Sequence, residues 1–317
     1  MIRFGVIGLG KIAHTFLKCC NYLNVPIEGV ASRSLENAKK YQEEYHAKHA
    51  YGSYKELLEN PDVDAIYLAT PHGLHYEQIK MILEYNKPIL VEKAFCMNTK
   101  EAEEVLKLAE EKKVLVMEAM WTRFLPAIKK LEEIVNSNKY GKVKFIQATF
   151  NFEGDLSKSN RLMNKELGGG AIYDIGIYPL TLCNLLLGKP TELEAEGELD
   201  NEGVDVSSSY VYSVDGVLGM CNCSFNRPLE RTAKLILEKA YIYMPSFWAS
   251  EGFEIRDLNN ELLEKIELPF ECNGFEYQIR SFIKTLEEGK IENSTMPHSK
   301  TIEMLKIIDE VNRLMHE

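Results

Sequence analysis

Near its beginning the chain reads Phe4-Gly5-Val6-Ile7-Gly8-Leu9-Gly10-Lys11-Ile12-Ala13, and this stretch decides the fold. The first four residues form a short apolar run of the kind that makes a buried parallel strand. Two glycines then break the run, and residues 11–22 predict a helix. Gly8 permits a tight bend, Gly10 leaves room for a phosphate, and Ala13 keeps the strand and the helix close together.

A strand, a glycine turn and a helix in this order are typical of a dinucleotide-binding site. The first turn of the helix offers unpaired N–H groups and the positive end of the helix dipole to a pyrophosphate. We therefore expect a dinucleotide to contact Gly8, Leu9, Gly10, Lys11 and Ile12. An ordinary strand-to-helix turn without a ligand is the alternative interpretation.

The composition is that of an ordinary globular protein with an acidic balance. The chain has 317 residues, of which 45% are hydrophobic and 27% charged, and it is long enough for two domains. Its net charge of −11 argues against nucleic acid and against an anionic membrane surface as partners. The seven cysteines are odd in number and lack Cys-x-x-Cys spacing. With no signal-peptide pattern at the start, we expect a cytoplasmic protein with reduced thiols and no membrane partner.

The order of the predicted elements indicates two domains of different class. Up to about residue 120, short apolar strands alternate with helices, which predicts a doubly wound parallel sheet of the Rossmann kind. Beyond that point strand-like runs predominate, and we expect strands at 142–152, 192–198, 204–214, 217–225 and 233–243. We expect helices at 123–136, 171–187, 275–288 and 299–315. The prediction is an α/β domain at 1–120 for dinucleotide binding, followed by an α+β domain at 121–317. The second domain would have a mostly antiparallel open sheet and serve substrate binding and oligomerisation.

Polar residues follow three of the predicted parallel strands, and ligands of open α/β sheets bind beyond such strand ends. At the first, Ser32-Arg33-Ser34, no acidic residue stands where an NAD-binding fold places one for the ribose 2′-hydroxyl. An arginine flanked by serines suits a 2′-phosphate instead. Ser32 and Arg33 thus predict NADP in preference to NAD, with a solvated surface arginine as the alternative.

The second polar strand end reads Thr70-Pro71-His72-Gly73-Leu74-His75. The two histidines have no cysteine or carboxylate close by in sequence, so we expect no metal here. A loop at the edge of the cofactor fits better, and we expect Thr70, Pro71, His72 and His75 to contribute to cofactor binding.

The third polar strand end is the pair Glu92-Lys93, which comes directly after a buried strand. In a dinucleotide fold it points toward the nicotinamide. There a lysine can hydrogen-bond a substrate hydroxyl or lower the pKa of a neighbouring group. A solvated strand end is the alternative interpretation.

In the second half, Gly168-Gly169-Gly170 precedes an apolar helix that carries Asp174 and Tyr178. These two residues are four apart and so share one helix face. A buried aspartate needs a partner, which Lys93 could supply. The alternative is a capping aspartate beside a core tyrosine.

Taken together and in order, these motifs resemble the glucose-fructose oxidoreductase / inositol dehydrogenase family (Gfo/Idh/MocA). The resemblance covers essentially the whole chain. Residues 117–124 and 174–178 are more narrowly similar to the trans-dihydrodiol dehydrogenase and NADP-dependent D-xylose dehydrogenase branch. The resemblance implies a Rossmann domain, an open sheet that often forms an oligomer, and NAD(P)-dependent oxidation of a sugar or cyclic diol. It also implies that Lys93, Asp174 and Tyr178 form the catalytic group.

Two positions depart from the pattern of the family. Many members have proline after the Glu-Lys pair, whereas this chain has Ala94. Many members carry histidine four residues after the aspartate, whereas this chain has Tyr178. Because of the first departure, the backbone conformation that the family has after the lysine does not carry over to this chain. The second departure agrees with the dihydrodiol branch, and it weakens the inference that this protein shares the substrates of the sugar-specific members.

We accordingly expect an NADP-preferring dehydrogenase in which hydride passes between the nicotinamide and a hydroxyl-bearing carbon. Tyr178 would exchange the hydroxyl proton, Lys93 would favour the ionised tyrosine, and Asp174 would orient the lysine or the substrate. Trp121, Arg123 and Phe152 are candidates for the substrate pocket, although each fits a core or domain-interface position equally well. The alternatives are an NAD-dependent inositol-type dehydrogenase and a non-catalytic dinucleotide sensor. Alternating apolar residues in the second half predict a homodimer through the open sheet face.

Overall fold

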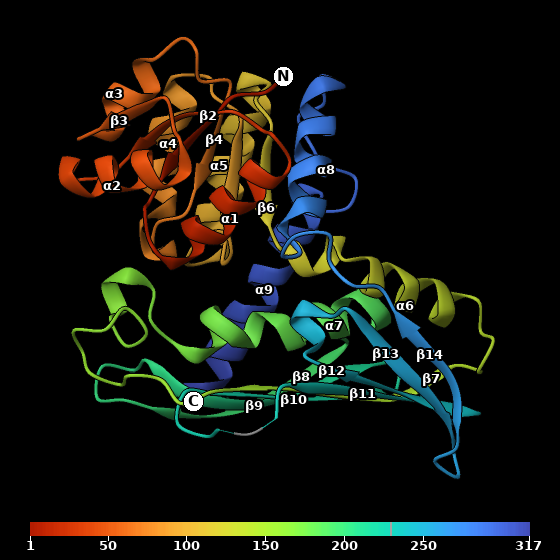
Figure 1. Ribbon diagram of the computed structural model, residues 1–317. Helices are drawn as coiled ribbons and strands as arrows, with labels where there is room; N and C mark the ends of the chain where they lie inside the picture. The colour runs from red at the N-terminus through yellow and green to blue at the C-terminus, as the bar shows by residue number, and fades with distance from the viewer. Residues whose placement is uncertain (229) are drawn as a thin grey trace. The chain divides into compact units, whose positions relative to one another are not determined.

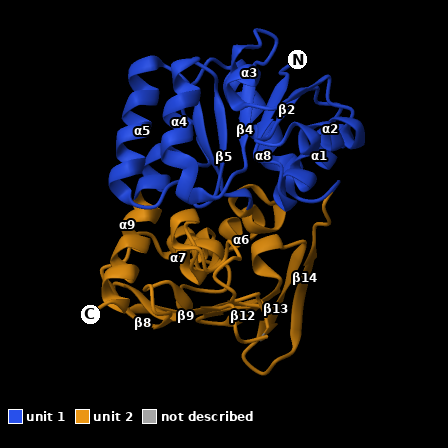
Figure 2. Ribbon diagram, turned by 90° about the vertical axis from the view of Figure 1, so that its left-hand side faces the viewer, with its two compact units in different colours: residues 1–121, 271–302 blue, residues 122–270, 303–317 orange. Residues whose placement is uncertain are grey.

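The computed structural model describes residues 1–228 and 230–317, which form two compact units (Figure 2). The first unit comprises residues 1–121 and 271–302, and the second comprises residues 122–270 and 303–317. The domain division predicted after residue 120 places everything downstream in the second domain. The compact units instead group residues 271–302 with the N-terminal part of the chain.

The first unit is built on a six-stranded parallel sheet with the order β3-β2-β1-β4-β5-β6 (Figure 1). Its strands are β1 (Phe4–Ile7), β2 (Ile27–Ala31), β3 (His49–Tyr51), β4 (Ala65–Leu68), β5 (Ile89–Glu92) and β6 (Val116–Ala119). All residues of these strands except those of β3 are buried, as expected for a parallel sheet covered on both faces. The predicted doubly wound α/β class is confirmed.

Helices cover both faces of this sheet. They are α1 (Lys11–Tyr22), α2 (Leu35–Tyr45), α3 (Tyr54–Glu59), α4 (His75–Glu84), α5 (Thr99–Lys112) and α8 (Phe275–Glu287). Helix α4 packs against α5 on one side of the sheet, and α1 packs against α8 on the other (Figure 2). Because α8 comes from the far end of the chain, the first unit is completed by residues that the sequence pattern assigned to the second domain.

The second unit contains an eight-stranded sheet with the order β14-β13-β12-β11-β7-β10-β9-β8. Its strands are β7 (Val143–Asn151), β8 (Glu192–Leu199), β9 (Asp205–Val214), β10 (Val217–Ser224), β11 (Thr232–Leu237), β12 (Ala240–Pro245), β13 (Gly252–Asp257) and β14 (Leu262–Glu267). Among the described strands of this sheet only β7 and β10 pair in parallel, so the predicted mostly antiparallel sheet is confirmed. The single strand predicted at 233–243 is wrong, because β11 and β12 are separate antiparallel strands.

Two helices of the second unit, α6 (Pro126–Asn136) and α7 (Ile177–Leu187), lie on one face of its sheet (Figure 1). The helix predicted from residue 123 begins only at Pro126, which lacks an N–H and suits a first helical position. The helix predicted at 171–187 starts with a π-helical turn at Ile172–Gly176. The last helix, α9, spans His298–Met315.

Within the described residues, one helical stretch, Lys165–Leu187, has the length and apolar composition of a membrane span. In its most apolar window, 78% of the residues are buried inside the protein. The buried core helix of a soluble protein passes the same test, and the α7 part of this stretch packs against β7, β9 and β10.

Candidate active site

The glycine turn after β1 is closed on one side and open on the other. Gly8 has φ +91°, and a Cβ at this position would lie 2.5 Å from the backbone of Ala69 and Thr70 at the end of β4. A Cβ on Gly10 would meet nothing within 4 Å. The first turn of α1 carries no acidic residue, and Lys11 forms no ion pair with the described residues. The turn therefore offers an open, unopposed helix N-terminus, which fits a pyrophosphate.

Helix α2 holds this turn from the side. The hydroxyl of Tyr41 donates a hydrogen bond to the carbonyl oxygen of Gly10 at 3.1 Å, and it also lies 2.7 Å from Nε2 of His14. Ser34 begins α2 by accepting the N–H of Asn37 at 3.2 Å. The turn is thus fixed by a neighbouring helix rather than by its own glycines alone.

Arg33 stands beside the turn, one residue past Ser32 after the end of β2. The strands are in register here, with Ile7 of β1 opposite Ala31 of β2. The Arg33 side chain is exposed and forms no ion pair with the described residues. Burial raises the pKa of Tyr54, and the Arg33 charge opposes that rise, which places the guanidinium near this tyrosine. The arginine is therefore available to an anion at this edge of the sheet.

The loop after β4 is held by His75, which is fully buried. Its Nε2 lies 2.9 Å from the carbonyl oxygen of Thr70, and its Nδ1 lies 3.1 Å from that of Ala94. Burial lowers the pKa of His75 to about 4, so the ring is neutral near pH 7. A neutral ring donates its one N–H to only one of these carbonyl oxygens, but it brings the loops after β4 and β5 together. Contact with a cofactor stays a prediction.

The remaining predicted residues of the β4 loop lie close to the strand end. The hydroxyl of Thr70 donates to Oε1 of Gln78 at 2.5 Å. Pro71 precedes a short 3₁₀ turn, His72–Leu74, in which His72 is buried. Of the four residues predicted here, Thr70, His72 and His75 are buried and Pro71 is half-buried.

At the end of β5, Glu92 is buried and accepts a hydrogen bond from the hydroxyl of Tyr67 at 2.5 Å. Burial raises the pKa of Glu92 to about 7, although Tyr67 and the Lys93 charge oppose the rise. Lys93 is half-buried, and the peptide bond between Lys93 and Ala94 is cis. The sequence did not indicate Tyr67 as a partner of Glu92, because the two residues come together only when β4 pairs with β5 in the sheet.

In the first unit the structure thus brings the predicted cofactor residues to one edge of the sheet. The turn after β1 and the loops after β2, β4 and β5 all leave the carboxyl ends of neighbouring strands. The strand order reverses between β1 and β4, and such a reversal is where open α/β sheets bind ligands.

In the second unit, the three glycines before the π-helical turn are each required by the backbone. Gly168 and Gly170 have φ of +82° and +129°. A Cβ on Gly169 would lie 2.8 Å from backbone atoms of Leu162 and Asn164. The turn itself is capped by Asp205, whose carboxylate accepts the N–H of Ile172 at 2.9 Å. This cap fixes the start of the segment that carries Asp174 and Tyr178.

Asp174 pairs with Arg161, which comes from the loop after β7. The two guanidinium Nη atoms lie 3.2 to 3.4 Å from the carboxylate oxygens. The side chain of Asp174 is 15% exposed and that of Arg161 is 55% exposed. A partner for the aspartate was expected, and the second unit supplies one that no sequence spacing indicated. Pairing with Lys93 stays a prediction.

Tyr178 is buried among aromatic side chains. Its ring stacks on Phe150 with a centroid distance of 5.5 Å, and Phe150 in turn lies 4.4 Å from Trp248. The predicted pocket residue Phe152 packs against Phe225 of the same unit, with ring centroids 5.2 Å apart. The geometry gives Tyr178 a fixed ring, as a proton-transfer group requires.

The other two predicted pocket residues flank the boundary of the units in sequence. Trp121 contacts Phe275 of the first unit with ring centroids 5.2 Å apart. Arg123, in the second unit, is buried. Their roles in substrate binding stay predictions.

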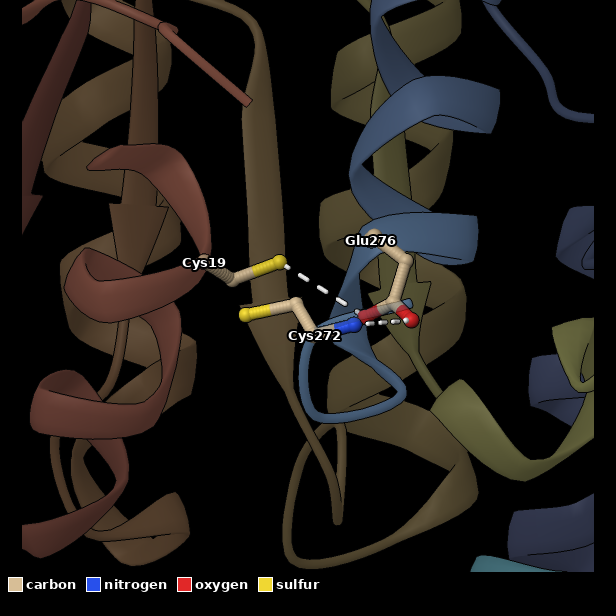
Figure 3. A group of neighbouring side chains, drawn as sticks. All are labelled: Cys19, Cys272 and Glu276. Atoms are coloured by element: carbon tan, nitrogen blue, oxygen red, sulfur yellow. Dashed lines mark hydrogen bonds between the residues drawn. The ribbon is translucent and has the colours of Figure 1, made fainter. Parts of the chain in front are cut away.

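One group of metal-type ligands occurs in the described residues, outside this site (Figure 3). The ligand atoms of Cys19, Cys272 and Glu276 lie within 4.8 Å of one another. The Glu276 carboxylate, however, accepts four backbone N–H groups from residues 271–274. Burial also raises the pKa of both thiols, which opposes metal binding. The group is best explained as an anchor for the loop before α8.

Sequence comparison gives two matching family profiles. The profile described as "Oxidoreductase family, NAD-binding Rossmann fold" (Gfo/Idh/MocA) matches residues 2–120, and the Gfo/Idh/MocA C-terminal domain matches residues 128–243. The scyllo-inositol 2-dehydrogenase (NADP(+)) IolU of Bacillus subtilis is 30% identical, over 99% of this chain and 97% of its own. The trans-1,2-dihydrobenzene-1,2-diol dehydrogenase of Danio rerio is 29% identical, over 98% of this chain and 96% of its own.

Solved structures share the fold over nearly the full length. A 3-ketoreductase from Actinomadura kijaniata, solved with NADP and TDP-benzene, superposes with a TM-score of 0.87 at 24% identity. That match covers 98% of this chain and 97% of the other. An aldose-aldose oxidoreductase from Caulobacter crescentus, solved with glycerol, gives 0.88 at 19% identity, over 99% and 97% of the two chains.

Proposed function

This chain belongs to the Gfo/Idh/MocA family of oxidoreductases, and from that premise we propose that it is an NADP-preferring dehydrogenase of a sugar or cyclic trans-diol. A bound nicotinamide supplies the hydride acceptor of such a reaction. The observation that carries the proposal is the glycine turn, closed by Ala69 and Thr70 on one side and open at Gly10 on the other. The fit of this turn to a pyrophosphate agrees with the NAD-binding profile.

The preference for NADP rests on Arg33. Its guanidinium is exposed, carries no ion pair among the described residues, and stands at the strand end where the ribose of a dinucleotide lies. Ser32 adds a hydroxyl beside it. A 2′-phosphate matches the planar fork of an arginine, and NAD lacks this group. The Bacillus subtilis relative is named for NADP, which supports the same choice.

For proton transfer we propose that Tyr178 takes the proton of the substrate hydroxyl. Lys93 acts as the positive charge that favours the ionised tyrosine, and Asp174 orients a substrate hydroxyl or the lysine. Three features of the second unit support this assignment. Tyr178 is held by Phe150, Asp174 is held by Arg161, and Asp205 fixes the segment that carries both.

We further propose a cytoplasmic homodimer that forms through the open face of the second unit's sheet. No described helix of that unit covers this face, and it exposes 51% of Met220 and 41% of Leu218. Exposed apolar residues gathered on one sheet face indicate an interface. Every cysteine is a free thiol, as expected in a reducing compartment. Light scattering at micromolar concentration distinguishes the dimer from a monomer, which would contradict this proposal.

Activity measurements distinguish the proposed function from two alternatives. An NAD-dependent inositol-type dehydrogenase would turn over inositols with NAD at least as well as with NADP. A dinucleotide sensor would bind the cofactor without turnover. We expect NADPH to form over a panel of aldoses, polyols and trans-diols. Tight NADP binding without reduction of NADP on any member of the panel would favour the sensor.

A further inference from the structure

Arg231 lies in the connection between β10 and β11, and aromatic rings surround its guanidinium. Its Nε donates a hydrogen bond to the carbonyl oxygen of Asn151 at 3.0 Å. Its guanidinium carbon lies 5.6 Å from the ring centroids of Phe150 and of Trp248, and 5.9 Å from that of Phe152. The guanidinium is therefore held among three aromatic rings and one carbonyl.

The charge of Arg231 has no acidic partner among the described residues. Other arginines of the described residues do pair with carboxylates, among them Arg3, Arg161, Arg227, Arg256, Arg280 and Arg313. Arg33 and Arg231 have no such pair, although the chain carries 48 acidic residues against 37 basic ones. Arg33 is the proposed reader of a phosphate, and Arg231 shows the same lack of an internal anion.

The contacts of Arg231 leave its anion-binding groups available. A guanidinium carries five N–H donors, and the Asn151 carbonyl takes only the one on Nε. The four N–H groups on the two Nη atoms remain as a planar fork on an exposed side chain. Because the rings and the carbonyl already fix the guanidinium, an anion that binds it loses little freedom of the side chain.

This fork and the proposed proton-transfer residue share one aromatic neighbour. Phe150 is the common neighbour, since its ring stacks on Tyr178 at 5.5 Å and faces Arg231 at 5.6 Å. Phe152, which the sequence predicts as a pocket residue, also faces the guanidinium. All of these residues belong to the second unit, so the relation is internal to one compact body.

We propose that Arg231 is a substrate-binding residue that selects sugars carrying an anionic group, a phosphate or a carboxylate. This inference rests on the proposed function, because it takes Tyr178 to mark the reacting hydroxyl. It deepens that function by naming a substrate class. A neutral diol would use the aromatic surface of this site and leave the fork to water, whereas an anionic sugar would use both.

The test compares three ligands that differ in their charged group: glucose, glucose 6-phosphate and glucuronate. Calorimetry at constant ionic strength, with saturating NADPH so that no sugar is oxidised during the titration, gives the dissociation constant of each. Hydrogen bonds to charged groups predict that the wild type binds the anionic sugars about 10- to 150-fold more tightly than glucose. Arg231→Met keeps the apolar stem and should lose this preference. Arg231→Lys keeps the charge without the fork and should retain part of it.

Arg227→Met is the matched control, because Arg227 lies in the same connection but already pairs with Glu198 at 3.6 Å. It should keep the full preference, and all variants should bind NADP as the wild type does. Equal affinity of the wild type for the three sugars would overturn the inference, as would an equal effect of Arg227→Met. NADPH formation is measured separately. A neutral sugar that is oxidised without any anion preference would remove the role of Arg231 and leave the proposed function intact.

Discussion

The carboxylate of Asp174 forms an ion pair with the guanidinium of Arg161, and its Oδ1 lies 3.2 Å from Nη1. The aspartate sits in a π-helical turn, and the arginine comes from the loop that follows β7. Arg161 thereby fixes the direction of a carboxylate that we place in the catalytic group.

The first prediction concerns this pair. Arg161→Met should lower kcat by up to about 10²-fold, because a misplaced catalytic carboxylate loses its alignment with the substrate. Lys158→Met is the control, since Lys158 lies in the same loop but pairs with Glu202. Steady-state kinetics on the best substrate would measure both. An Arg161→Met enzyme with an unchanged kcat would show that the pair has no part in turnover.

The second prediction concerns proton transfer. Tyr178→Phe keeps the ring that stacks on Phe150 and removes only the hydroxyl, so the fold should survive. General acid–base groups contribute about 10²–10⁴-fold, and kcat should fall by that factor. The dissociation constant of NADP should not change. Near-normal turnover by Tyr178→Phe would mean that another group carries the proton.

The third prediction uses the two glycines of the turn as a matched pair. Gly8→Ala puts a Cβ 2.5 Å from the β4 backbone at φ +91°, and it should lower the free energy of unfolding by about 1–3 kcal/mol or more. Gly10→Ala meets no protein atom within 4 Å, so it should leave stability nearly unchanged and weaken NADP binding. Denaturant unfolding and cofactor titration measure the two effects. Undiminished NADP affinity in Gly10→Ala would contradict the proposed phosphate position.

The fourth prediction concerns pH. Burial raises the pKa of Glu92 to about 7, above its ordinary value of 4.5, so the folded protein holds this proton more tightly than the unfolded chain. This contribution to stability is fully present below pH 4.5 and is lost as the pH rises through 7. The loss amounts to about 3 kcal/mol, at 1.36 kcal/mol per pKa unit.

Glu92→Gln removes that titration and should flatten the fall in unfolding free energy between pH 5 and pH 8. Asp205, whose pKa burial also raises to about 7, still titrates in the variant. The informative quantity is therefore the difference between wild type and variant at each pH. Parallel curves for the two proteins would show that Glu92 ionises normally in the folded state.

The sequence was sufficient where function depends on local backbone. Gly8 and the glycines at 168–170 could be located because φ or crowding at the position itself requires glycine, and Gly10 because a phosphate needs the open space there. The strand ends followed from apolar runs, which bury both faces of a parallel sheet. Each of these features depends on residues that are consecutive in the sequence.

Partners that come together only through tertiary packing could not be predicted. Nothing in the spacing of residues connects Tyr67 to Glu92, Arg161 to Asp174, or Asp205 to the turn at Ile172. The place of α8 in the first unit was missed for the same reason, since it packs against α1 from the far end of the chain. The strands β13 and β14 were not predicted, because their short sequences lack a strong apolar pattern.

The central claim is that the edge of the first sheet binds NADP and recognises its 2′-phosphate through Arg33. The most direct measurement is the dissociation constant of NADP and of NAD for the wild type and for Arg33→Ala. One charge-assisted contact is worth about 1.5–3 kcal/mol, so the wild type should prefer NADP by about 10- to 150-fold. Arg33→Ala should lose most of that preference while binding NAD as before. A wild type that prefers NAD, or equal losses for both cofactors in Arg33→Ala, would contradict the account.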